Sequence, residues 1–193
     1  MRIVLFLFAS FFSADVLGQT AVDSAAIKQV DSLIRVSRAF TRKRDFDKAL
    51  EINAAAQKIA LEKLGRVSAA YGNCCHERSR VFAFKQDYVE AETLCLEAIR
   101  IREKVLGNEH PDYATSVDFL ASTYLRMGKY EDAEPLYLKA KTIRANVLGK
   151  EHPDFAVSLL NLTAFYSTIG NFEKAELPAL EAIAIQKKLL GKE

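Results

Sequence analysis

The residues best suited to chemistry stand next to one another at Cys74, Cys75, His76 and Glu77. Thiolates, imidazoles and carboxylates are the ligands of zinc, and a thiol near an imidazole can act as a nucleophile. Successive residues of a helix point about 100° apart, so four consecutive side chains cannot converge on one ion. No second Cys/His pair with ligand spacing occurs elsewhere in the sequence. We therefore predict no catalytic site and no metal site here, with Cys75 in the core and His76 on an inner surface.

Two further histidines, His110 and His152, each precede a Pro-Asp pair and are forty-two positions apart. Equivalent positions in successive repeats are separated by the width of a helical pair, whereas a shared zinc ion needs ligand nitrogens about 2 Å away. Their expected role is structural, in the turns that lead to Pro111 and Pro153. The sequence thus predicts no metal, no cofactor and no enzymatic activity.

The elements that position these residues repeat along the chain. A period of roughly 20 to 50 residues is typical of a solenoid or an array of small units. Three further sets of positions keep the step of forty-two that separates the two histidines. The aromatic set is Phe46, Tyr88, Tyr130 and Phe172, the alanine set is Ala49, Ala91, Ala133 and Ala175, and the glycine set is Gly65, Gly107, Gly149 and Gly191.

Each repeat is predicted to be two amphipathic helices joined by a short turn. From Tyr130 onward, apolar residues recur every three or four positions, which is the spacing of one helix face. Gly128 stands where a helix ends in a left-handed residue, and Pro111 fits the first turn of a helix. Ala121 and Ala133 are expected to face each other, so that the two backbones of a hairpin approach closely.

One hairpin cannot bury both of its faces alone, so neighbouring hairpins must stack into a continuous array. The sequence therefore predicts an all-α fold, a right-handed α-solenoid of about four helical hairpins. The predicted units are 22–64, 69–106, 111–148 and 153–190, with helices at 22–43, 45–64, 69–85, 87–106, 111–127, 129–148, 153–169 and 171–190.

The segment 1–18 has the layout of a secretory signal peptide. Met1 and Arg2 form a positive start, residues 3–12 are an apolar run, and Gly18 ends a stretch of small or modest residues. The run is shorter than the roughly 20 residues that span a bilayer. We predict cleavage after Gly18, export to the periplasm or the exterior, and no stable membrane insertion afterwards. The alternative is a buried N-terminal helix.

The overall composition fits a globular helical chain. Half of the 193 residues are hydrophobic, with only 8 Gly and 4 Pro, which excludes collagen-like and disordered classes. The 27 Lys and Arg against 25 Asp and Glu leave a net charge of +2. Because nucleic-acid binders carry a large or clustered basic excess, no nucleic-acid partner is expected.

The repeat motif resembles the tetratricopeptide repeat. Its pattern of small and aromatic residues is clearest in the third unit, at Leu120, Ala121, Tyr124, Gly128, Tyr130, Ala133, Tyr137 and Ala140. The forty-two-residue period and the L-G-x-E-H-P-D linker resemble the kinesin-light-chain type, and the similarity covers about residues 28–193. The array assigned on this basis is 19–193. It also resembles the N-terminal repeat region of exported bacterial proteins that end in a caspase-like CHAT domain.

The resemblance implies a non-catalytic protein–protein interaction scaffold that binds a peptide or a partner protein in its concave groove. The alternative is a regulatory or sensor arm of a larger protein with a C-terminal CHAT protease domain. After Glu193 the repeat pattern predicts a further His-Pro-Asp, so we expect truncation at the C-terminus. The apolar last helix then predicts self-association as a further alternative.

The resemblance also implies which residues face the groove. Asn161 matches an asparagine that many peptide-binding grooves of this family use, but the other units lack it, so no carboxylate clamp is predicted. Arg38, Arg42, Arg80 and Arg126 are expected to form a basic stripe, which favours an extended acidic ligand. A solvated polar face balanced by acidic residues is the alternative. The predicted groove residues are Arg38, Arg42, Asn73, His76, Arg80, Thr115, Asp118, Ser122, Arg126 and Asn161.

The three cysteines are too few for a disulfide framework. Cys75 and Cys95 nevertheless fall on facing helices of one predicted hairpin. A disulfide between them is therefore a hypothesis for an exported protein.

Overall fold

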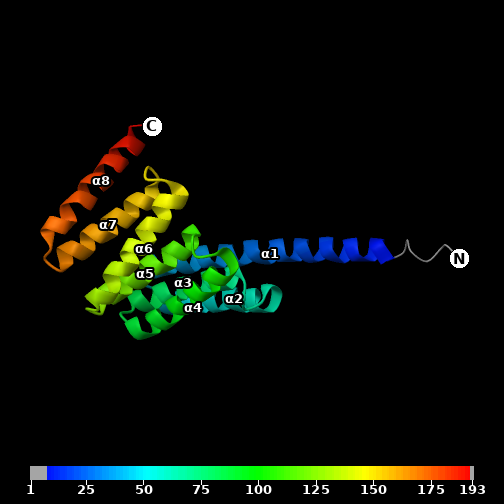
Figure 1. Cartoon of the computed structure of the whole chain (residues 1–193). Helices are drawn as coiled ribbons and strands as arrows, with labels where there is room; N and C mark the ends of the chain where they lie inside the picture. Colours follow the sequence, from blue (N-terminus) through cyan, green and yellow to red (C-terminus); the bar gives the residue numbers. More distant parts are fainter. Residues whose placement is uncertain (1–7, 192–193) are drawn as a thin grey trace.

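The computed structural model describes residues 8–191, with side chains from residue 23 onward. Within that part of the chain all regular structure is helical, and eight helices follow one another (Figure 1). They are α1 (Phe8–Arg42), α2 (Phe46–Leu64), α3 (Ala69–Phe84), α4 (Tyr88–Leu106), α5 (Pro111–Arg126), α6 (Tyr130–Leu148), α7 (Pro153–Thr168) and α8 (Phe172–Leu190).

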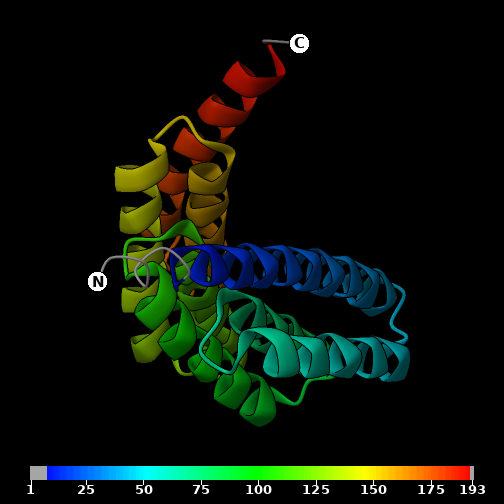
Figure 2. The same ribbon diagram turned by 90° about the vertical axis from the view of Figure 1, so that its right-hand side faces the viewer.

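Consecutive helices pair into four antiparallel hairpins, α1 with α2, α3 with α4, α5 with α6 and α7 with α8. The second helix of each hairpin packs on the first helix of the next. The first helices also meet directly, α1 with α3 and α5 with α7, and so share one side of the array. Figures 1 and 2 show the resulting bend, with α8 turned away from the direction of α1. The predicted all-α solenoid of four hairpins is confirmed.

The predicted helix bounds agree with the structure to within about a residue, except at the first helix. There α1 begins at Phe8 rather than at residue 22 and extends beyond its partner α2 (Figure 1). The prediction ended the signal peptide at Gly18, but a single helical glycine costs only about 1 kcal/mol relative to alanine and does not by itself end a helix. Residues 1–7 of the predicted signal peptide lie outside the described residues. In the part of the chain that the structure describes, no helix has the length and apolar character needed to cross a membrane.

The helix starts are fixed by local hydrogen bonds. Asp45 and Asp87 precede α2 and α4, and their carboxylates accept hydrogen bonds from the backbone N–H groups of the first turn. His110 does the same for α5, where its Nδ1 accepts from the Asp112 N–H at 3.0 Å, and His152 repeats this contact for α7 at 3.1 Å. The predicted structural role of these two histidines is confirmed.

Small residues form the contact inside each hairpin. Ala49, Ala91 and Ala133 are completely buried, and Ala133 shares a core cluster with Ala121 and Tyr137. The predicted pairing of Ala121 with Ala133 is therefore confirmed. The same small-residue packing therefore recurs inside successive hairpins.

Candidate functional site

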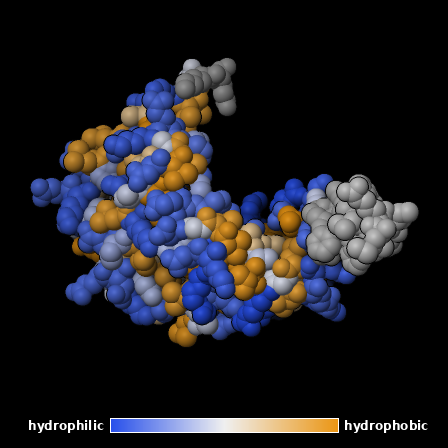
Figure 3. All heavy atoms as spheres, turned by 45° about the vertical axis from the view of Figure 1, so that its right-hand side comes forward, coloured by the Kyte–Doolittle hydropathy of each residue, from blue (hydrophilic) through white to orange (hydrophobic). Residues whose placement is uncertain are grey.

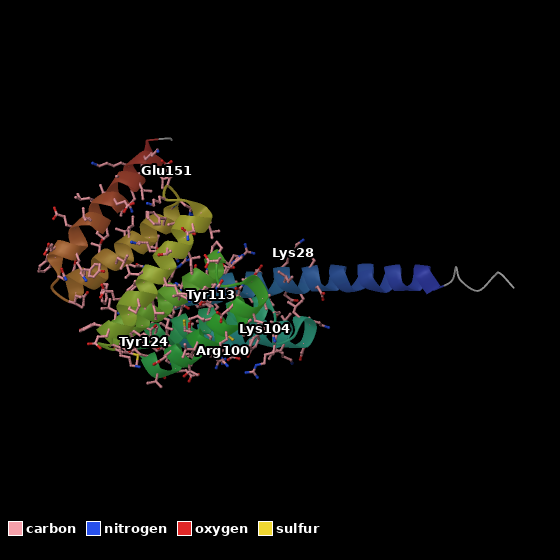
Figure 4. The ribbon with its side chains drawn as sticks, viewed as in Figure 1. Lys28, Arg100, Lys104, Tyr113, Tyr124 and Glu151 are labelled. Carbon is pink, nitrogen blue, oxygen red and sulfur yellow. The ribbon has the colours of Figure 1, made fainter. Side chains whose placement is uncertain are left out.

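A cavity of about 650 Å³ lies on the side where the first helices meet. Residues from α1, α3, α4 and α5 line it. The space-filling view shows the molecule indented between the last hairpin and the first helix (Figure 3), and Lys28 extends from α1 (Figure 4). The cationic side chains on its wall are Lys28, Arg35, Arg38, Arg80 and Arg102, and the acidic ones are Asp31 and Asp112.

Two of these arginines converge on one carboxylate. Glu77 of α3 is fully buried, and its Oε2 accepts hydrogen bonds from Arg38 Nε at 3.0 Å and from Arg80 at 3.2 Å. Its second oxygen, Oε1, has no hydrogen-bond partner. One carboxylate therefore forms ion pairs with two guanidinium groups on the cavity wall.

Arg102 reaches the cavity from α4, passing between α3 and α5. Although it is only 4% exposed, its guanidinium donates only to uncharged acceptors, namely the Asp112 carbonyl at 2.7 Å, the Ser116 hydroxyl at 2.6 Å and Asn73 Oδ1 at 2.8 Å. Within residues 23–191 no carboxylate forms an ion pair with it. Burial accordingly lowers the pKa of Arg102, against the attraction of the Asp112 charge.

His76 lies beside Arg102. Its Nδ1 is 3.2 Å from the Ser116 hydroxyl, and its ring meets Phe119 edge-on with centroids 5.5 Å apart. Burial, followed by repulsion from Arg102, holds the pKa of His76 well below its usual value of 6.5. The imidazole is therefore neutral at pH 7 and supplies no charge of either sign to the cavity.

The next interface along the chain repeats this arrangement with one difference. Arg144 of α6 is also 4% exposed, donates to the Ser158 hydroxyl at 2.7 Å and reaches the Thr115 hydroxyl at 3.3 Å. Here, however, the Asp118 carboxylate lies 3.6 Å from the guanidinium and accepts a 2.6 Å hydrogen bond from Asn161. Burial raises the pKa of Asp118, although Arg144 and Asn161 act in the opposite direction.

The structure divides the ten predicted groove residues among several environments. Arg42 is exposed and lines neither of the cavities described here, while Asp118 and Asn161 bind each other. Arg38 and Arg80 line one cavity and Arg126 lines another, and the basic stripe of four arginines stays a prediction. The 650 Å³ cavity takes Arg38, Asn73, His76, Arg80 and Thr115, and a second cavity of about 440 Å³ takes Ser122 and Arg126 together with Arg44 and Phe119.

Sequence reasoning missed Arg102 and Arg144. Both belong to second helices, which the family resemblance does not place on the groove, and yet both side chains pass inward between hairpins. A signal was present in the sequence, because the two arginines are one repeat apart and Ser116 and Ser158 keep the same step. A charged residue repeated at a helix position among apolar neighbours indicates a buried, bonded group.

The cysteines are free thiols in the structure. Cys75 packs in the N-terminal core cluster, as predicted, whereas Cys95 donates to the Ser116 carbonyl of α5 at 3.3 Å. The hypothetical disulfide between them is thus not formed, because Cys95 is bonded to the next hairpin. Burial raises the pKa of each of the three thiols to about 12, so none is a thiolate at pH 7. Among the described residues no group of three or more His, Cys, Asp or Glu side chains could hold a metal ion.

Comparison with known proteins agrees with this architecture. A family model described as a tetratricopeptide repeat matches residues 75–140 and 116–188, which together make up more than half of the chain. No curated protein matches the sequence significantly.

Solved structures extend the similarity. BtubC (BKLC) from P. vanneervenii superposes with a TM-score of 0.72 at 24% identity, over 84% of this chain and 65% of that one. A putative kinesin light chain from Podosopora anserina with nearly identical TPR-like repeats gives a TM-score of 0.70 at 25% identity, over 84% and 77%. A single-residue variant of that protein gives 0.70 and 25%, over 84% and 76%. The chain therefore spans somewhat less than two thirds of the length of BtubC.

Proposed function

The chain belongs to the tetratricopeptide repeat family, whose repeats mediate protein–protein interaction, and on this premise we propose that it is a non-catalytic scaffold that binds an extended segment of a partner protein along its inner side. The observation that carries the proposal is the 650 Å³ cavity, because helices of three successive hairpins contribute to its wall. A cavity of that size accommodates several side chains of a bound segment.

The charge of the cavity favours an acidic segment. Five cationic side chains line it, and Glu77 and the two aspartates are the carboxylates that face them. Guanidinium groups bind carboxylates through paired hydrogen bonds, which gives orientation as well as affinity. A solvated polar face remains the competing interpretation, since exposed ion pairs contribute little.

Charge reversal at the cavity rim tests this function. Lys28 and Arg35 are exposed and line the cavity, so Lys28→Glu with Arg35→Glu reverses its charge without disturbing the buried Glu77 cluster. The matched control reverses one arginine and one lysine that are exposed on α4 and line neither cavity, Arg100→Glu with Lys104→Glu. Capture of envelope proteins on immobilised protein, quantified by mass spectrometry, is expected to lose the specific partner with the first pair and retain it with the second. Equal retention by both pairs would contradict binding at this cavity.

We further propose that residues 1–18 direct export and are removed. Support comes from the charged start, the short apolar run and the small residues before Gln19. N-terminal sequencing of the secreted protein is expected to begin at Gln19. A mature protein that begins at Met1 contradicts the proposal.

Two alternatives rest on the same array. A regulatory arm of a longer CHAT-domain protein predicts a downstream His/Cys dyad in the full-length gene.

Self-association through α8 is favoured by its exposed apolar residues, of which Phe172, Leu177 and Leu190 are each more than 70% exposed. Figure 3 shows hydrophobic residues, in orange, on the surface of the last hairpin. Light scattering that shows a molar mass rising with concentration would favour self-association.

A further inference from the structure

The second interface joins the second and third hairpins, and the third interface joins the third and fourth. The two interfaces are built from equivalent residues. Arg102 and Arg144 reach inward from the second helices, and each donates to a serine of the following helix, Ser116 or Ser158. Each also donates to a polar side chain of the first helix of its own hairpin, Asn73 for Arg102 and Thr115 for Arg144. All of these pairs of positions are one repeat apart. The buried arginine and its two hydrogen-bond partners are therefore common to both sites. Any difference between the sites comes from the side chains around them.

The difference lies in one pair of residues. At the third interface Asp118 and Asn161 are hydrogen-bonded, and the Asp118 carboxylate lies 3.6 Å from Arg144. One repeat earlier, the second interface has His76 and Phe119 in these places, and the two rings pack edge-on. The chain thus supplies an internal carboxylate for one buried arginine and a neutral ring for the other.

The interface without the internal carboxylate is also the one that opens into the large cavity. Arg102 and His76 both line that cavity, and neither Asp118 nor Arg144 does. The other carboxylates nearby are already engaged or lie at the surface. Glu77 accepts from Arg38 and Arg80. Asp31 and Asp112 are exposed, and Asp112, with a carboxylate oxygen 3.9 Å from His110, attracts Arg102 without forming an ion pair with it. A buried cation without a charged partner is costly, and an anion bound from the cavity would compensate its charge.

We propose that this cavity binds the carboxylate of an aspartate or glutamate side chain of the partner, which approaches Arg102 from the cavity and supplies the negative charge that Asp118 supplies to Arg144 at the third interface. The proposal rests on the scaffold function above and adds the anchoring contact to it. The ligand carboxylate lies among Arg102, Arg80 and Arg38, while the rest of the acidic segment follows the exposed Arg35 and Lys28 at the rim. The site then selects an acidic residue because Arg102 has no carboxylate of the described residues as an ion-pair partner, whereas Arg144 has Asp118.

Replacing the missing group within the chain tests this site. His76→Asp places a carboxylate in the position equivalent to Asp118, next to Arg102, so the chain itself should then supply the charge that the ligand carboxylate otherwise supplies. The probe is fluorescein-labelled hexaglutamate, followed by fluorescence polarisation at constant ionic strength, with labelled hexaglutamine as the uncharged reference. Loss of a charge-assisted contact predicts at least about tenfold weaker binding of hexaglutamate by His76→Asp.

The matched control is Ala164→Asp, which adds the same charge at an exposed inner position on α7, outside the cavity. Because distant charges are screened by salt, its affinity is expected to stay within about threefold of the wild type. Equal weakening by both substitutions would mean that the peptide senses only general charge, and the site assignment would be overturned. Stronger competition by inorganic phosphate than by glutarate at equal ionic strength would overturn the assignment to a carboxylate.

Arg102→Met provides a second route if His76→Asp does not fold, as judged by circular dichroism. It removes the buried cation and keeps an unbranched side chain, so hexaglutamate binding is again expected to weaken about tenfold, and unchanged affinity would overturn the proposal. The failure of this proposal is distinguishable from that of the scaffold function. If no variant affects hexaglutamate binding while the Lys28 and Arg35 reversal still abolishes partner capture, the anchoring site is wrong and the scaffold function stands.

Discussion

The second and third hairpin interfaces show how one repeated frame supports two different sites. In both, a buried arginine links two hairpins through a serine hydroxyl. In the third interface Asp118 forms an ion pair with the arginine, whereas in the second His76 leaves the arginine without a carboxylate partner beside a 650 Å³ cavity. The comparison teaches that the packing of a repeat can be kept while two side chains decide whether an interface is structural or open to a ligand.

The largest expected effect concerns the two arginines themselves. Arg144→Met leaves the buried Asp118 carboxylate without a cation, and breaking a buried pair in this way costs about 3 to 5 kcal/mol of the free energy of unfolding. Arg102→Met leaves only neutral acceptors and removes an uncompensated buried charge, so its cost should be about 1 to 2 kcal/mol. Urea unfolding followed by circular dichroism measures both. Equal losses would show that the two interfaces are electrostatically alike.

The fold could be predicted from the sequence because its determinants are local and repeated. The constant step between Ala49, Ala91 and Ala133 marked the buried contact in each hairpin, and the turns followed from Gly and Pro. The start of α1 could not be placed, since no proline separates the apolar residues 3–12 from the first hairpin and one glycine is a weak break. Helix ends are strongly determined only where the sequence carries a cap or a breaker.

The candidate site was only partly predictable, for a different reason. The resemblance identified Arg38, His76 and Arg80 on the inner side, and all three line the cavity. It could not identify Arg102, because whether a long side chain on a second helix turns inward depends on the partners that the neighbouring hairpins offer, here Asn73 and Ser116. Sequence periodicity assigns helix faces, whereas a side chain as long as that of arginine reaches past its own face.

A smaller effect on stability tests whether the second and third hairpins also differ in their interiors, and not only at their interfaces with the next hairpin. Ala91 and Ala133 are equivalent and completely buried inside the second and third hairpins. Ala91→Leu and Ala133→Leu should therefore each cost about 1 to 3 kcal/mol through overpacking. Urea midpoints for the two variants are expected to agree with each other, with Ala164→Leu on the exposed face of α7 as the control that changes little. Clearly unequal costs would extend the difference between the two regions to the interior of the hairpins.

The smallest effect concerns the turns inside the hairpins. Gly128 and Gly170 occupy the left-handed turn position with φ of 75° in the third and fourth hairpins, while Gln86 adopts φ of 67° in the second. A side chain at positive φ costs about 1 to 2 kcal/mol, of which the greater freedom of glycine in the unfolded chain offsets part. We therefore expect Gln86→Gly to raise the free energy of unfolding by about 0.5 to 1 kcal/mol, seen as a higher melting temperature.

The reverse substitution, Gly128→Ala, makes this prediction specific to the backbone. A Cβ at Gly128 would meet no atom within 4 Å, so any loss of stability on this substitution arises from the φ angle and not from a clash. The expected loss is about 1 kcal/mol, opposite in sign to the gain from Gln86→Gly. If both substitutions lowered the melting temperature, the side chain of Gln86 would have to stabilise its turn by more than the positive φ costs. The second hairpin would then differ from the third through its turn as well as through His76.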